Sequence, residues 1–355
     1  MLNTRTVYLT KTKRLYVLAL ATFFFLSVIS QCLGLQYSQG IQSYGTVSYR
    51  LMGANISYRV ATASILDIAR DAGAKCIRHH GLSKYVNDPT WKQSMSTVRT
   101  LCTERGIKLR YASIGQDSWD TGLVGSSWAQ WKADVFMNTN GLGDQWINDH
   151  AQIISWLKPD LIDVMNEPMD LVGTTWEGED DLVFQNYLAF VLRAIDAWRA
   201  VKPDLVCVVA GFPYWDMMRM ALNPIPRSNI LYDYHVYYSY TGAAPSEPWQ
   251  LAYWEGRLED AKKLLYEDIL LRGNLQDMIK ANLPLTLGEV GCHIQNPNAD
   301  IYMRDIFDFC KQYNMGMLWH ALSAYPPENS GLLASDWSSL NTLGQVWARN
   351  MLGVS

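Results

Sequence analysis

Eight short apolar segments alternate with longer stretches of helical periodicity after residue 40, and this alternation restricts the possible folds more than any other feature of the sequence. The clearest helix is predicted over 181–201, where apolar residues recur at steps of three and four, and 62–72 is similar. Segments such as LVCVVA at 205–210 are apolar throughout, which is typical of parallel strands covered by helices on both faces. The expected strands are, in chain order, 41–47, 74–78, 108–113, 160–165, 205–210, 230–236, 283–287 and 315–319.

Eight β-then-α units in one chain predict an α/β fold of the (β/α)8 TIM-barrel type, with an open doubly wound sheet as the alternative. No Pro/Ser-rich linker or low-complexity stretch interrupts residues 36–355, so we expect a single domain there. The hydrophobic share of 49% is enough for a large core. In such a barrel the catalytic groups lie at the carboxyl ends of the strands, because the βα loops share one open face there.

Residues 15–30 form an uncharged apolar segment that follows four basic residues, Arg5, Lys11, Lys13 and Arg14. This pattern predicts an export signal, so residues 1–35 are expected to be a signal peptide or a signal anchor. The apolar core is longer than that of most signal peptides and shorter than a full membrane span, unless it extends to residue 35. Cleavage and a membrane tether through residues 15–35 therefore both stay open. In either case the basic flank predicts a barrel outside the membrane, secreted or at the cell surface.

The charge and the short motifs exclude several classes of function. The formal net charge of -4 leaves no basic field for a polyanion, so no nucleic-acid partner is expected. The chain has no GxSxG nucleophile elbow and no GxxxxGK or GxGxxG phosphate loop. His79 and His80 are neighbours on an expected strand and so point to opposite faces, and no HxH or HExxH spacing supplies a further ligand. We therefore expect no metal site.

The cysteines and the glycosylation sequon carry little functional information. Six cysteines are widely spaced and lack the CxxC pairs of zinc sites. We expect Cys76 and Cys207, which lie in apolar strand-like runs, to be small buried side chains. Asn55-Ile56-Ser57 is a single sequon, a pattern that is common by chance.

Polar residues follow several expected strands at the point where each strand ends. Glu167 and Glu289 end two apolar strands that are distant in sequence, so a barrel would bring both carboxylates to one face. Glycoside cleavage needs such a pair, with one protonated acid and one ionised nucleophile or base. For either glutamate alone, a helix cap or an arginine partner is an equally good explanation. The other strand-end residues are Arg78, Asn166, His235, Tyr237 and Trp319.

These residues stand in motifs that resemble the retaining glycosidases of clan A, most closely glycoside hydrolase family 5, the cellulase and mannanase group. The motifs are NEP at 166–168, YDYHVY at 232–237, LGEVG at 287–291 and the Trp that ends the eighth strand. The tripeptide NEP alone is weak, whereas the order of all four motifs is specific. The resemblance covers roughly residues 41–350 and implies the same barrel.

The resemblance also implies a role for each strand-end residue. Glu167 is the expected general acid/base and Glu289 the expected nucleophile. By the same match Asn166 binds the sugar 2-hydroxyl, Arg78 and Tyr237 hold the nucleophile, His235 lines the subsite of the cleaved sugar, and Trp319 stacks beneath that sugar. The carboxylate mechanism needs no metal and no organic cofactor.

The chemistry supports the two carboxylate roles independently of the resemblance. Glu289 must be ionised at rest, which a neighbouring Arg78 and a Tyr237 hydroxyl would favour. Glu167 must start protonated, and it can act as a base once the charge of Glu289 is lost in an ester.

Strands two and three depart from the family pattern. Strand two continues Arg78-His79-His80-Gly81 where the family commonly has an apolar residue and proline, and strand three lacks the usual histidine. Gln116 or Asp117 could take that hydrogen-bonding place, although a loop turn is an equally good explanation.

Tryptophan is abundant, with 14 residues, and four of them follow expected strands three to six. Aromatic rings stack on pyranose faces, so these residues could form subsites for a sugar chain, or they could pack the loops. The four are Trp119, Trp176, Trp215 and Trp249. We expect a retaining β-glycosidase, endo-β-1,4-glucanase-like, acting on a β-linked glucan or mannan polysaccharide or oligosaccharide. A non-catalytic glycan-binding barrel at the cell surface is the alternative.

Mass spectrometry of the mature N-terminus decides between the two fates of residues 1–35. A signal peptide predicts an N-terminus near Gln31 in soluble protein outside the cell. Recovery of Met1 in membrane-bound protein would contradict cleavage and indicate the anchor.

Overall fold

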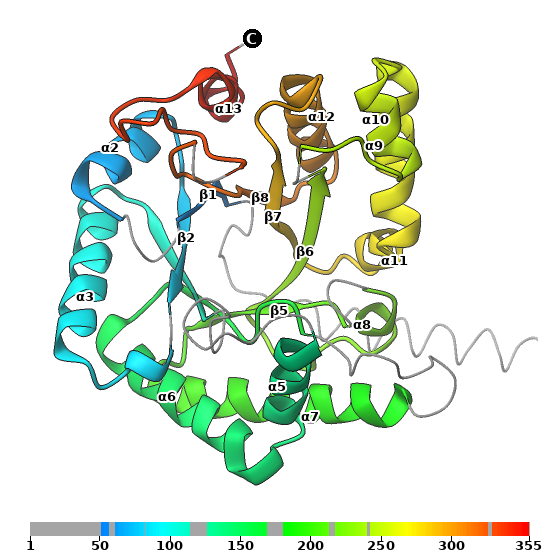
Figure 1. Ribbon diagram of the computed structural model, residues 1–355. Coiled ribbons are helices and arrows are strands. Elements are labelled where there is room, and N and C mark those ends of the chain that lie inside the picture. Colours follow the sequence, from blue (N-terminus) through cyan, green and yellow to red (C-terminus); the bar gives the residue numbers. More distant parts are fainter. Residues whose placement is uncertain are drawn as a thin grey trace, which may run out of the picture. The chain divides into compact units, whose positions relative to one another are not determined.

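Eight parallel strands close into a barrel in the order β1-β2-β3-β4-β5-β6-β7-β8, with β8 pairing back onto β1 (Figure 1). This is a computed structural model, and it describes residues 51–56, 61–81, 83–113, 126–168, 180–212, 217–239, 242–325 and 329–354. All of these belong to one compact unit, Thr46–Ser355. The predicted (β/α)8 barrel is therefore confirmed. The predicted signal or anchor at 1–35 lies outside the described residues, among which no helix is long and apolar enough to cross a membrane.

Seven of the eight predicted strands overlap observed ones, and the first does not. The segment 41–47 lies outside the described residues, and the barrel already has its eight strands without it. The observed strands are β1 Met52–Ile56, β2 Cys76–Gly81, β3 Lys108–Ser113, β4 Leu161–Asp163, β5 Val206–Ala210, β6 Ile230–Tyr238, β7 Leu285–Cys292 and β8 Gly316–Trp319.

Strand β1 escaped prediction because its sequence, MGANI, includes a glycine and an asparagine that serve close packing and hydrogen bonding. A Cβ on Gly53 would lie 1.7 Å from the backbone oxygen of Cys76, so only glycine allows β2 this close. The amide of Asn55 is fully buried and donates to the backbone oxygens of Gly288 and Leu318 at 3.1 and 3.3 Å. A buried, bonded Asn55 cannot carry a glycan, so the sequon has no role in the folded barrel.

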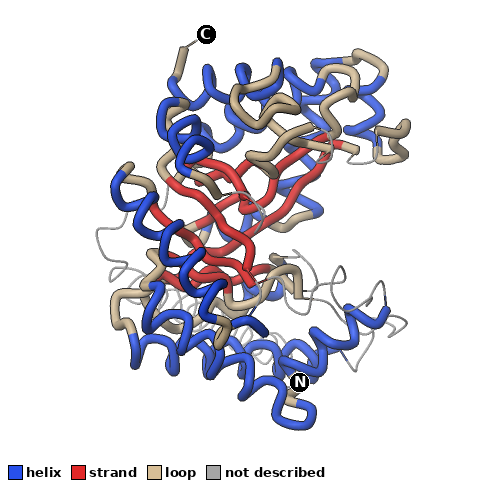
Figure 2. The backbone as a smooth tube through the Cα atoms, turned by 60° about the vertical axis from the view of Figure 1, so that its left-hand side comes forward, coloured by secondary structure: helices blue, strands red, loops and turns tan. Residues whose placement is uncertain are grey.

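Helices surround the strands on the outside of the barrel, as Figures 1 and 2 show. The predicted helices at 62–72 and 181–201 are confirmed as α2 and α7, and Thr62 caps α2 through the backbone N–H of Ile65. The helices are α2 Ala63–Asp71, α3 Pro89–Glu104, α5 Ser126–Phe136, α6 Leu142–Leu157, α7 Asp180–Val201, α8 Met218–Leu222, α9 Pro248–Trp254, α10 Leu258–Glu267, α11 Leu275–Lys280, α12 Ala299–Gln312 and α13 Thr342–Leu352, with shorter turns η1 Ser83–Tyr85, η2 Thr139–Gly141 and η3 Asp268–Arg272.

The barrel has two cores. The larger core lies between the strands and the helices. The described cysteines are all buried and unpaired, as predicted for Cys76 and Cys207. A second, small apolar cluster fills the inside of the barrel and consists of Cys76, Leu161, Val206, Val208, Leu231 and Leu318.

A layer of buried charge lies inside the barrel next to this small cluster. Its members are Arg78, Arg110, Asp163 and Asp233, each at most 3% exposed, and we call them the buried ion-pair layer. Three of them stand two positions after a residue of the small cluster and therefore point to the same side of their strands. Arg110 Nε donates to Asp163 Oδ1 at 2.5 Å, and Arg110 also pairs with Asp233. Such charges are tolerated away from water only when they are paired.

Replacement of Arg110 by methionine would leave two buried carboxylates without this cation. We expect Arg110→Met to lower the free energy of unfolding in urea by about 3–5 kcal/mol. The control, Arg304→Met, removes an exposed pair with Asp300 and is expected to cost about 0–1 kcal/mol. Equal losses in the two variants would contradict a structural role for the layer.

Candidate active site

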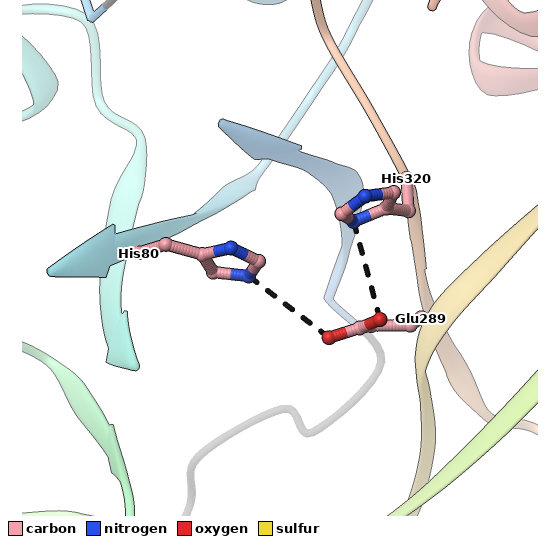
Figure 3. Close-up of side chains that lie close together, drawn as sticks. All are labelled: His80, Glu289 and His320. Atoms are coloured by element: carbon pink, nitrogen blue, oxygen red, sulfur yellow. Dashed lines mark ion pairs between the residues drawn. The ribbon is translucent and has the colours of Figure 1, made fainter. Parts of the chain in front are cut away.

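Glu289 lies in β7 at the open end of the barrel, with its side chain almost buried. Arg78 Nη1 donates to its Oε1, and the hydroxyl of Tyr237 donates to its Oε2 at 2.5 Å. Figure 3 shows His80 from β2 and His320 on either side of this carboxylate, each with a ring nitrogen 4.0 Å from one of its oxygens. Five side chains, from β2, β6, β7 and the residue after β8, thus converge on one point.

The charge state of Glu289 follows from its neighbours. Burial alone would raise the pKa of this carboxyl, but the positive charges of His235 and Arg78 outweigh burial and hold the pKa well below its ordinary value. Glu289 is therefore ionised at neutral pH, as a nucleophile requires.

Arg78 links the ion-pair layer to the site above it. Its Nε donates to Asp163 Oδ2 at 2.8 Å, and its Nη2 donates to Asn166 Oδ1 at 2.7 Å. Its Nη1 lies 3.1 Å from Asn55 Oδ1 and 2.9 Å from His80 Nε2. Because a guanidinium only donates hydrogen bonds, this contact is a hydrogen bond when His80 Nε2 accepts, that is, in the neutral imidazole with its single N–H proton on Nδ1. Burial and the charge of Arg78 both lower the pKa of His80, which agrees with that assignment.

Glu167 follows β4, and its backbone lies in the left-handed region with φ 44°. Its side chain is 18% exposed, more than that of Glu289. Lys132 Nζ, from α5, donates to the backbone oxygens of Asn166 and Glu167 at 2.6 and 2.8 Å. A residue of helix α5 thus holds the segment after β4 that carries this glutamate.

His235 joins the two glutamates. Its Nδ1 lies 2.9 Å from Glu167 Oε1 and 3.7 Å from Glu289 Oε2, and its Nε2 lies 3.4 Å from Asp233 Oδ2. One carboxylate oxygen of Glu167 and one of Glu289 lie within 4.8 Å of each other beside His235. Burial lowers the pKa of His235, but the carboxylates of Glu289 and Asp233 raise it to about 10, so the ring is an imidazolium at neutral pH.

The structure brings together six of the seven predicted site residues, and the role predicted for the seventh, Trp319, is wrong. Trp319 is fully buried, donates from Nε1 to the backbone oxygen of Ser330 at 3.1 Å, and lies 6.2 Å from the ring of Tyr302. Side chains alternate along a strand, so Leu318 points into the barrel, Trp319 points out towards α12, and His320 points in again. An enclosed indole offers no face to a sugar, and the residue beside the nucleophile is His320.

Neither cluster of histidine and glutamate here is a suitable metal site as it stands. His80, Glu289 and His320 present atoms within 4.8 Å of one another, and so do Glu167, His235 and Glu289. In the first cluster the lone pair of His80 Nε2 already accepts from Arg78. In the second, the protonated ring of His235 has no lone pair to offer.

Of the four tryptophans predicted to follow strands three to six, the structure describes Trp249. Trp119, Trp176 and Trp215 lie outside the described residues, as do Gln116 and Asp117. Trp249 is 4% exposed in α9, and its ring stacks on that of Tyr302 at 5.9 Å. For Trp249 the explanation as packing is confirmed.

Comparisons with known proteins agree with this geometry. A family model described as cellulase (glycosyl hydrolase family 5) matches residues 39–326, and no curated protein matches the chain. Three solved structures show the same fold at low identity. The catalytic domain of the major endoglucanase from Xanthomonas campestris pv. campestris is 15% identical with a TM-score of 0.59, over 86% of this chain and 95% of that one.

The other two structures contain sugars. A beta-glucanase from Saccharophagus degradans in complex with cellotetraose is 14% identical, with a TM-score of 0.59, over 86% of this chain and 88% of that one. A mannotriose complex of the Thermomonospora fusca beta-mannanase is 17% identical, with a TM-score of 0.52, over 86% of this chain and 92% of that one.

The raised pKa of His235 predicts how stability depends on pH. The folded state keeps the His235 proton up to about pH 10, whereas an unfolded histidine releases it near 6.5. The stabilisation by this proton is therefore complete below about pH 6.5 and is lost as the pH rises to about 10. We expect the free energy of unfolding to fall more steeply between pH 7 and about pH 10 in the wild type than in His235→Asn. If the free energy of unfolding, measured in urea, changed with pH equally in the wild type and in His235→Asn over this range, a charged His235 would be contradicted.

Proposed function

Because the chain belongs to glycosyl hydrolase family 5, we propose that it is a retaining β-glycoside hydrolase in which Glu289 is the nucleophile and Glu167 the general acid/base. We further propose an endo-acting β-1,4-glucanase, with β-mannan as the second candidate substrate. The family description, cellulase, and the beta-glucanase and mannanase folds support these two polymers. A secreted or membrane-tethered location for this activity is a proposal that rests on the sequence of residues 1–35 alone.

One observation carries the retaining mechanism. The facing oxygens of Glu167 and Glu289 lie within 4.8 Å of one another. Carboxyl pairs of retaining glycosidases are about 5–5.5 Å apart, whereas inverting enzymes leave roughly 6.5–9.5 Å for a water molecule. The short separation fits the retaining geometry better than one that holds a water molecule, and so supports direct attack on the sugar by one carboxylate.

In the first step Glu289 attacks the anomeric carbon, and the bond from that carbon to the leaving oxygen breaks. The proton of Glu167 goes to the leaving oxygen, and the sugar stays bound to Glu289 as an ester. Arg78 and Tyr237 support this step, because both donate hydrogen bonds to the ionised nucleophile. In the second step Glu167 takes a proton from water, the water oxygen attacks the anomeric carbon, and the ester bond breaks.

Two neighbours fit this cycle. The imidazolium of His235 stabilises the negative charge that Glu167 acquires when it gives up its proton. Asn166 accepts from Arg78 through Oδ1, so its amide group is left to donate towards a substrate hydroxyl. That orientation supports the role implied for Asn166 at the sugar 2-hydroxyl, where hydrogen bonds strengthen in the transition state.

Release of reducing sugar from β-glucan and β-mannan tests the function. We expect activity on one of these polymers, and a loss of at least about 10²-fold in Glu167→Gln and Glu289→Gln. The matched control is Glu255→Gln, an exposed glutamate paired with Arg257, which is expected to keep full activity. Binding of polymer without release, unchanged by either substitution in the site, would instead indicate a non-catalytic glycan-binding barrel.

A 2-deoxy-2-fluoro glycosyl fluoride tests the nucleophile separately. The fluorine at C2 slows both steps, but the good fluoride leaving group restores the rate of the first, so the ester is expected to accumulate. Peptide mass spectrometry should then locate the sugar on Glu289. Labelling of any other residue would overturn the assignment.

A further inference from the structure

Lys132 carries a buried amine that the catalytic steps above do not use. It lies in α5 and is 1% exposed, although lysine is among the residues that are least often fully buried. Its Nζ donates to the backbone oxygens of Asn166 and Glu167 at 2.6 and 2.8 Å. Two of its hydrogen bonds therefore go to the carbonyl groups of neighbouring residues, one of which is the proposed acid/base.

The backbone at Glu167 needs such support. Its φ of 44° lies in the left-handed region, which is unfavourable for a residue with a Cβ and persists only where surrounding contacts impose it. Lys132 supplies two of these contacts from an element more than thirty residues earlier in the chain. Because Lys132 is buried, little water competes for these two hydrogen bonds.

The electrostatic surroundings of Lys132 agree with a role close to the chemistry. Burial lowers the pKa of this amine to about 7, while the charges of Glu167 and Glu289 act in the opposite direction. Arg78 is the cation that disfavours its charged form. An amine that interacts with both glutamates is part of the site's charge distribution as well as of its scaffold.

We propose that Lys132 is the positioning residue of the acid/base, holding two successive carbonyl groups so that the left-handed turn at Glu167 directs its carboxyl group at the leaving oxygen. The inference rests on the proposed function, because it gives Glu167 the role of acid. Loss of these two hydrogen bonds would displace the carboxyl group of Glu167 and leave Glu289, Arg78 and Tyr237 in place. A displacement of about 1 Å can cost on the order of 10²-fold in rate.

Leaving groups of different acidity separate this role from a general loss of structure. The leaving group of a 2,4-dinitrophenyl glycoside, dinitrophenolate, departs without a proton. The value of kcat/KM reports the first step, so for this substrate it should not depend on the position of Glu167. A phenyl glycoside needs the proton. The assay therefore compares kcat/KM on aryl β-cellobiosides or aryl β-mannobiosides, whichever sugar matches the polymer that the wild type cleaves.

For Lys132→Met we expect kcat/KM on the phenyl glycoside to fall about 10²-fold and that on the dinitrophenyl glycoside to stay within about threefold of wild type. Lys132→Arg, which keeps the donors, should recover part of the loss. Lys262→Met is the control, since this lysine lies in α10 and its ion pairs are with Asp305 and Asp308 of α12. It should affect neither substrate. If Lys132→Met is insoluble, Lys132→Gln is measured by the same criterion.

Equal losses on the two substrates, or no loss on either, would overturn the proposal. Glu167→Gln is measured in parallel, so that the two levels of the argument fail separately. If Glu167→Gln shows no dependence on the leaving group, the proposed function itself is wrong. If it shows that dependence and Lys132→Met does not, only the role of Lys132 is wrong.

Discussion

The buried guanidinium of Arg78 is the contact on which the site depends. It is fully enclosed, and its hydrogen bonds reach Asp163 in the ion-pair layer, Asn55 in β1, Asn166 after β4 and Glu289 in β7. A cation in this position needs carboxylate partners, because the cost of removing it from water is otherwise too large. The pairing that Arg78 requires therefore also keeps the candidate nucleophile, Glu289, in its ionised form.

Charge balance explains how Glu289 can stay ionised inside the barrel. The two arginines of the ion-pair layer and the imidazolium of His235 face the two aspartates of that layer and Glu289, three positive against three negative charges. When Glu289 becomes an ester, one negative charge is lost from this set. The positive charge that remains then stabilises the carboxylate form of Glu167, which the second step of the proposed mechanism uses. One balanced set of side chains can thus serve both steps.

The sequence predicted the barrel and the meeting of Glu167 with Glu289, because apolar strands and the polar residues at their ends are local patterns. It failed at β1, where a glycine and an asparagine serve close packing and hydrogen bonds. It also placed the sugar platform at Trp319, because strand alternation near the last residue of a strand depends on a register that the sequence does not show; His320 points inwards instead. Lys132 was missed because its partners are backbone atoms of a distant segment, which leave no motif.

The configuration of the first product tests the central claim, that the two glutamates act as a retaining pair, most directly. Proton NMR during the first minutes of hydrolysis resolves the α and β anomers before they interconvert. Two successive displacements through Glu289 predict that the newly formed reducing end appears first as the β anomer. First appearance of the α anomer would show a single displacement by water and would contradict the account.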